Sequence, residues 1–193
     1  MSLSRRFIRP LLGVGLAFAA LGCGSASNND QGVSFTNLGF FGIDEEDGAC
    51  TDLGITGAAY SLGNSAASLF TCIGLQNNLS GQFIQSQRAT ISYFIPGAAV
   101  QPPTVVVPLA AVLGPGSTGA NTTLPDGVDN DSRAIAGLTL VTTDIWNFLV
   151  INERSLPNFP YTMLATVTVS GITSAGDRLD TNSTDIGIEV RAR

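Results

Sequence analysis

Alternation of apolar and polar residues near the C-terminus constrains the fold of this 193-residue chain more than any other sequence feature. Ile186, Ile188 and Val190 alternate with polar or small residues, and residues 163–172 repeat the pattern with Ala, Val and Thr. A period of two places alternate side chains on opposite faces of a strand, so both segments are predicted strands with one buried face. The turn-rich residues 173–184 between them predict an antiparallel hairpin.

Four further apolar, β-branched or aromatic runs, separated by turn residues, lie at residues 33–41, 82–95, 104–113 and 134–151, the last long enough for two strands or one bent strand. Short strands at this spacing are typical of two-sheet sandwiches, so we predict an all-β, antiparallel β-sandwich with Greek-key connections. This is a fold-level analogy to bacterial immunoglobulin-like modules.

Two local features refine this prediction. Residues 57–69 are rich in Ala and Ser, and they predict one short helix. Pro102, Pro103 and Pro108 flank or interrupt residues 104–113. Because proline has no amide donor for a neighbouring strand, this segment is expected at the edge of a sheet.

Missing residue types narrow the chemistry that the chain can perform. The sequence contains no His and no Lys, so its nine basic residues are all Arg. This excludes catalytic relays and zinc sites that use His, and also Schiff bases and phosphate-binding loops that use Lys. Carboxylates, Arg, Tyr and hydroxyls remain, which restricts an enzyme to schemes such as carboxylate-dependent hydrolysis. We therefore expect a protein that is not an enzyme.

Residues 1–22 have the layout of an export signal. Arg5, Arg6 and Arg9 precede an apolar run of 11 residues at positions 11–21. A membrane-spanning helix needs about 20 apolar residues, so this run is too short to span a membrane as a stable helix. A basic start followed by a short apolar run is typical of a segment that is removed after export.

The end of this segment resembles a known processing site. Ala20-Leu21-Gly22-Cys23 is similar to the lipobox of bacterial lipoproteins, in which small or aliphatic residues and a Gly precede the lipidated Cys. The resemblance covers residues 1–23 only, and it implies cleavage before Cys23 and two or three acyl chains on that residue. Several acyl chains hold a protein firmly on a membrane. An ordinary secretory signal with a free Cys23 thiol is the alternative.

The residues after Cys23 bear on destination and organisation. Gly24 stands where an Asp would imply retention at the inner membrane, which favours the outer membrane of the cell envelope. Residues 24–32 are small and polar, as in flexible tethers. The predicted organisation is therefore a signal peptide at 1–22, the lipidated Cys and tether at 23–32, and one β-sandwich domain at 33–193.

Cleavage would also change the charge of the protein. Without residues 1–22 the chain keeps six Arg against fifteen acidic residues, compared with a formal net charge of −6 for the full sequence. Phosphate backbones repel an acidic surface without Lys, so nucleic acid is not an expected partner.

Cys50 and Cys72 are the one pair that remains if Cys23 carries lipid. An exported protein folds in an oxidising compartment, where a pair of thiols normally forms a disulfide. We therefore predict a disulfide that closes a loop of 22 residues. Redox-active pairs usually have a C-x-x-C spacing, which is absent here, so the predicted bridge is structural. Two free buried thiols are the alternative.

Two acidic segments are candidate metal sites. Residues 44–47 form a run of four carboxylates, and Asp126, Asp129 and Asp131 lie close together in PDGVDND. Hard oxygen ligands in glycine-containing loops suit Ca²⁺. The second segment resembles the acidic turns of calcium-binding repeats on bacterial surface proteins, although no second repeat and no Gly after Asp131 is present. Solvated acidic turns are the alternative for both segments.

These observations lead to three hypotheses of decreasing weight. The first is a lipid-anchored cell-envelope protein with a structural or interaction role toward an envelope protein or a glycan. The second is a calcium-stabilised binding module, with glycans as its ligands, that uses Asp126, Asp129 and Asp131. The third is a carboxylate-dependent hydrolase. Trp146 has apolar neighbours in the sequence and is expected in the core.

Overall fold

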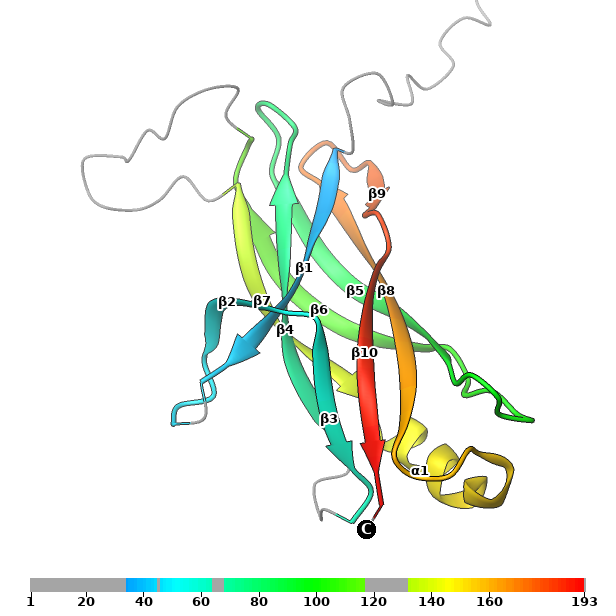
Figure 1. Cartoon of the computed structure of the whole chain (residues 1–193). Coiled ribbons are helices and arrows are strands. Elements are labelled where there is room, and N and C mark those ends of the chain that lie inside the picture. The colour runs from blue at the N-terminus through cyan, green and yellow to red at the C-terminus, as the bar shows by residue number, and fades with distance from the viewer. Residues whose placement is uncertain (1–33, 45, 64–67, 117–131, 193) are drawn as a thin grey trace, which may run out of the picture. The chain divides into compact units, whose positions relative to one another are not determined.

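Strands make up most of the computed structural model, which describes residues 34–44, 46–63, 68–116 and 132–192. Within these residues there are ten strands, one α-helix and one 3-10 helix (Figure 1). Their bounds are β1 Phe35–Ile43, β2 Cys50–Ile55, β3 Gly57–Ser61, β4 Leu69–Asn77, β5 Ile84–Phe94, β6 Val105–Leu113, β7 Arg133–Val141, α1 Thr143–Ile151, η2 Glu153–Ser155, β8 Tyr161–Thr173, β9 Arg178–Asp180 and β10 Thr184–Arg191.

The strands form two sheets, as predicted. Sheet A has the order β2-β1-β4-β7, and sheet B has the order β3-β10-β8-β5-β6, with β9 pairing with β8. The expected purely antiparallel pairing is wrong at one place, because β3 runs parallel to β10. The parallel pair arises because β2 and β3 follow one another with only Thr56 between them and lie at the margins of different sheets (Figure 1). Residues 50–61 therefore contribute one strand to each sheet.

The core lies between the two sheets and follows from the alternation in the sequence. In β8 the residues from Tyr161 to Thr173 alternate strictly between buried and less buried positions. Ile73 and Leu138 of sheet A and Val167 and Ile188 of sheet B are among its almost fully buried side chains. Each buried aliphatic side chain contributes about 1.5–3 kcal/mol relative to exposure. The alternating pattern thus places the side chains whose burial stabilises the domain.

Two positional predictions are confirmed. Strands β8 and β10 pair antiparallel, with Ile186 opposite Ala165, so the C-terminal hairpin is present. Strand β6 lies at the margin of sheet B, which is the edge position expected from its prolines.

The second half of the predicted strand run 134–151 is a helix. Strand β7 ends at Val141, and α1 begins at Thr143. The side-chain oxygen of Thr142 accepts a hydrogen bond from the Ile145 amide at 3.4 Å, which caps the helix, and Asp144 lies in its first turn. Ile145 and Leu149, four residues apart, are fully buried. A continuous apolar run does not by itself distinguish a strand from a buried helix. Here the helix cap at Thr142 favours the helix.

The short helix predicted for residues 57–69 is wrong for the residues described. Residues 57–61 form β3 and residue 69 begins β4, while residues 64–67 lie outside the described residues. Tyr60 and Leu62 are buried in the core, and β3 pairs with β10 over its whole length. Burial and strand pairing therefore override the helix propensity of Ala in this segment.

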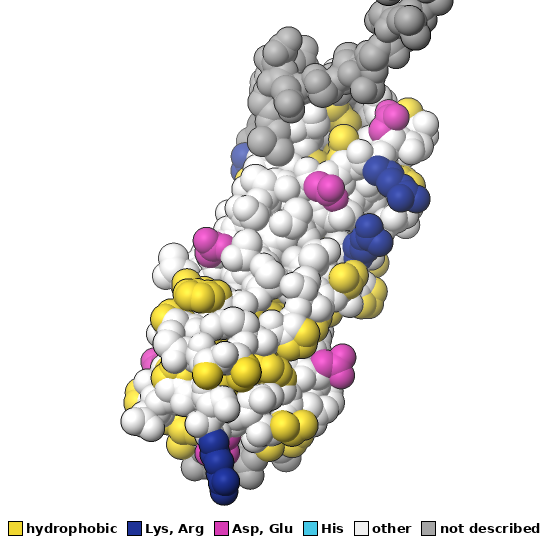
Figure 2. Space-filling model, turned by 90° about the vertical axis from the view of Figure 1, so that its right-hand side faces the viewer, with side chains coloured by type: hydrophobic (Ala, Val, Ile, Leu, Met, Phe, Trp, Pro, Cys, Tyr) yellow, Lys and Arg dark blue, Asp and Glu magenta, His cyan; other side chains and the backbone are white. Residues whose placement is uncertain are grey.

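The surface of the domain carries few charges. Figure 2 shows the side that carries α1 and the β5–β6 connection, where hydrophobic side chains gather in the lower half and charged side chains are scattered. Exposed large hydrophobic residues include Phe94, Val106, Val112 and Leu164 of sheet B, and Leu38, Phe70 and Ile135 of sheet A.

Candidate functional site

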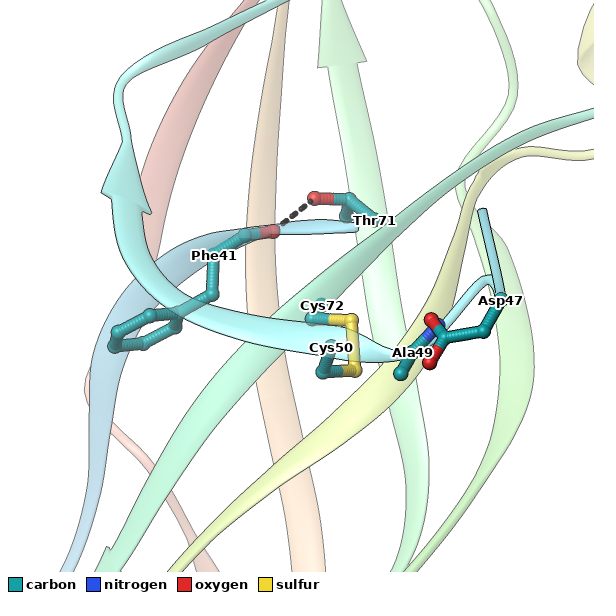
Figure 3. The surroundings of a disulfide bond; sticks show 6 residues. All are labelled: Phe41, Asp47, Ala49, Cys50, Thr71 and Cys72. Carbon is teal, nitrogen blue, oxygen red and sulfur yellow. Dashed lines mark hydrogen bonds between the residues drawn. A yellow bond between two sulfur atoms is a disulfide. The ribbon is translucent and has the colours of Figure 1, made fainter. Parts of the chain in front are cut away.

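The predicted disulfide joins Cys50 and Cys72, with their Cα atoms 5.7 Å apart. Cys50 begins the marginal strand β2, whereas Cys72 lies in β4 and is only 1% exposed. Phe41 of β1 lies beside the bridge, and its carbonyl oxygen accepts a hydrogen bond from the Thr71 hydroxyl at 3.1 Å (Figure 3). Strand β2 contains no fully buried residue. The covalent bond therefore fastens a strand that hydrophobic burial holds weakly.

The first acidic segment forms the turn between β1 and β2. The Asp44 carboxylate accepts a hydrogen bond from the Glu46 amide at 2.8 Å, and that of Asp47 accepts one from the Ala49 amide at 2.8 Å. Glu45 lies outside the described residues. These bonds are those of side chains that stabilise a tight turn. In the described part of the chain, no group of three or more carboxylate or thiol side chains is arranged to hold a metal ion.

The remaining predicted site residues cannot be placed. Asp126, Asp129 and Asp131 lie in residues 117–131, and Cys23 lies in residues 1–33, and both segments fall outside the described residues. Calcium binding and lipidation therefore remain predictions from the sequence.

Trp146 packs against the core as a partly buried side chain, as expected. Its indole nitrogen is buried and has no hydrogen-bond partner among the described residues, and the same holds for the Tyr161 hydroxyl. The Tyr93 hydroxyl, in contrast, donates to the Leu140 carbonyl oxygen at 2.7 Å and so ties β5 to β7. Trp146 thus packs against the hydrophobic core, and the two tyrosines lie within it.

Two asparagine clusters were not predicted. The Asn37 amide donates to the Asn182 side-chain oxygen at 2.9 Å, and the Asn182 side-chain nitrogen donates to the Asn37 carbonyl oxygen at 3.2 Å. The Asn37 side chain in turn accepts from the Gly39 amide at 2.9 Å, where β1 has a bulge and Gly39 adopts a φ of 107°. A non-glycine residue rarely adopts this conformation. The cluster links β1 of sheet A to the segment before β10 of sheet B.

Asn77 forms the second cluster and is completely buried. Its side-chain nitrogen donates to the carbonyl oxygens of Gln82 and Gly114, both at 2.7 Å, and its side-chain oxygen accepts from the Leu79 amide at 2.9 Å. The Asn77 amide group thus joins the turn that follows β4 to Gly114, which lies 37 positions further along the chain. An Asn at the end of an apolar strand is the only signal that the sequence offers for it.

Comparisons with known proteins do not assign a family. No protein-family model matches the chain, and no curated protein matches it. Among solved structures, it is similar to the alkylpurine DNA glycosylase AlkC of Pseudomonas fluorescens, bound to DNA containing an abasic site analog, at 14% identity and a TM-score of 0.38. The match covers 82% of this chain but only 31% of that chain. A similarity this weak supports no conclusion about function.

The described residues include no helix that is both long and apolar enough to cross a membrane.

Among the described residues, tyrosine ionisation is the first side-chain titration expected above neutral pH. Burial raises the pKa of Tyr60 to about 12, and burial together with the negative charge of Glu153 raises that of Tyr161 to about 12. Burial raises the pKa of Tyr93 as well. No His or Lys is present, and Cys50 and Cys72 are disulfide-bonded.

We therefore expect a free energy of unfolding that is nearly constant between about pH 6 and pH 9 and falls above about pH 10. Above that pH the unfolded chain releases tyrosine protons that the folded chain retains up to about pH 12. Urea unfolding at a series of pH values measures this, and Tyr161→Phe should remove part of the alkaline decrease. A free energy of unfolding that changes most steeply near neutral pH would contradict the expectation.

Proposed function

We propose that this chain is a lipid-anchored protein of the bacterial cell envelope with a non-enzymatic structural or interaction role. The Cys50–Cys72 disulfide is the observation that carries the proposal, because such bonds form and persist in oxidising compartments outside the cytosol. The basic and apolar residues 1–22 and the lipobox-like Ala20 to Cys23 supply a route to that compartment.

The architecture of the domain agrees with an interaction role. Its described acidic turn uses the carboxylates of Asp44 and Asp47 to bind backbone amides, and its tyrosine side chains are buried in the core. What the domain offers to solvent is broad sheet faces with exposed apolar side chains such as Phe70 and Val106. Exposed apolar patches often mark surfaces that bind other molecules. The outer membrane is the destination that Gly24 favours.

The intact mass of the protein extracted from bacterial membranes tests the proposal. The expected mass corresponds to a chain that begins at Cys23 and carries two or three acyl chains, and reduction should add two hydrogen atoms for the Cys50–Cys72 bond. Cys23→Ala is the matched control, and it should yield an unlipidated chain that no longer fractionates with membranes. Full-length, unprocessed protein in the cytosol would contradict the proposal.

A further inference from the structure

Strand β6 is apolar on both faces although the described part of the domain covers only one of them. Its sequence is VVVPLAAVL, and Val107, Leu109 and Leu113 face the core. On the opposite face, Val106 is 60% and Val112 is 65% exposed, and Pro108 and Ala110 between them are exposed as well. Continuous apolar runs are typical of strands that are covered on both faces. The outer face of β6 thus has the composition of a buried surface.

The apolar surface continues across the outer face of sheet B. Phe94 of β5 and Leu164 of β8 are register partners and are 53% and 39% exposed. The positions between them and β6 carry hydroxyl side chains rather than charges, namely Thr90, Ser92, Thr166, Thr168 and Ser170. This face, which we call the outer face of sheet B, carries Arg88 as its single charge over β6, β5 and β8. Its other charged side chains lie on β9 and β10.

Two exposed residues of opposite charge lie on either side of β8, at the same position along the strands. Arg88 of β5 and Asp180 of β9 are both register partners of Ser170 in β8. Asp180 accepts a hydrogen bond from the Ser170 hydroxyl at 2.6 Å, and both charged side chains are exposed. Arg88 has no ion-pair partner within the described residues. A basic and an acidic group at one level, separated by β8, form a self-complementary pattern.

The size of the face matches that of an interface between proteins. Five strands about 4.8 Å apart, with an average length of about nine residues, have an outline of roughly 24 Å by 30 Å, or about 700 Å². A stable interface buries about 800 Å² on each partner. The same estimate for the four strands of sheet A gives only about 500 Å². Sheet B therefore offers the larger continuous surface.

We propose that the outer face of sheet B binds a second copy of this chain, so that the protein is a symmetric dimer. A twofold axis parallel to β5 and β8, between these strands, brings the β6 margin of one copy over the β9–β10 margin of the other. Arg88 then lies beside Asp180 of the second copy, and the reciprocal pair forms by symmetry. The same arrangement places the exposed valines of β6 opposite the β9–β10 margin of the second copy.

This arrangement also suits an anchored protein, and in that respect it rests on the proposed function. Rotation about an axis parallel to the strands leaves both copies of β1 beginning at the same end of the dimer, at Phe35. The two tethers of residues 24–32 would then reach the same membrane.

Site-specific crosslinking in the full-length chain tests the dimer. Thr90→Cys places a thiol on β5 beside the proposed axis, and Thr139→Cys places one on the outer face of sheet A as the matched control. A short bifunctional maleimide should give a crosslinked dimer with Thr90→Cys only. The reaction is run on whichever cell fraction holds the protein, so its result does not depend on anchoring. Equal crosslinking of both variants, or of neither, would overturn the proposal.

Charge reversal gives a second and independent measurement. Arg88→Glu and Asp180→Arg should each weaken dimerisation at least tenfold in sedimentation velocity, because each places like charges together at both symmetric contacts. The double variant should restore dimerisation, and circular dichroism should show unchanged folding in all three. A monomeric wild-type protein, or single variants that dimerise normally, would contradict the dimer while leaving the lipid anchor untouched.

Discussion

Asn77→Asp is expected to destabilise the domain by on the order of 4 kcal/mol, through the loss of buried donors and the burial of a carboxyl group. The side-chain nitrogen of Asn77 donates to two carbonyl oxygens, both at 2.7 Å, in a position that is completely buried. A carboxylate there would face two acceptors without a proton to share. Natural domains are stable by only about 5–15 kcal/mol, so such a loss is a large fraction of the total.

Urea unfolding at pH 7 measures the effect, and its pH dependence identifies the cause. Burial among acceptors raises the pKa of the introduced carboxyl group in the folded state, so the variant should recover stability as the pH falls and the group binds a proton. Asn158→Asp makes the same chemical change at an exposed position and should cost little. Similar stabilities for the two variants would show that the Asn77 hydrogen bonds do not stabilise the fold.

Removal of the Cys50–Cys72 disulfide is expected to lower the free energy of unfolding by about 3 kcal/mol, the value for closing a loop of 22 residues. The double variant Cys50→Ser and Cys72→Ser mimics the reduced protein without leaving a reactive thiol. Because β2 contains no fully buried residue, the loss should be largest locally. Once the bond is absent, β2 is held mainly by its backbone pairing with β1.

Hydrogen exchange resolved along the chain tests this local effect. Amides of β2 should exchange faster in the double variant than in the oxidised protein, whereas those of β8, between β10 and β5 in the interior of sheet B, should change little beyond the global loss. Unchanged exchange in β2 together with unchanged stability would show that the strand is held by other contacts.

Patterns with a short period predicted the parts of the fold that depend on local sequence. Alternation placed β8 and β10 correctly, because a half-buried strand records its two faces directly in its residues. Proline placed β6 at a margin through a missing donor. The pairing of Cys50 with Cys72 followed from the small number of cysteines and the expected compartment.

Features that depend on distant parts of the chain could not be predicted in this way. Strand β3 contains Ala and Gly and adopts a strand because β10 lies beside it, which no local pattern records. Asn37 and Asn182 exchange hydrogen bonds although 145 positions separate them. Helix α1 is intermediate, since Thr142 before Asp144 is a capping signal that could have been recognised.

The position of β1 in sheet A has a mechanical consequence. Strand β1 is the first described strand of the chain and lies between β2 and β4, both antiparallel to it. A force pulling on the residues before Phe35 would therefore act along β1 and load the backbone bonds on both of its sides at once, instead of peeling a marginal strand one bond at a time. The disulfide joins the two flanking strands, β2 and β4. A domain held at its N-terminal end would therefore resist unfolding by a pulling force.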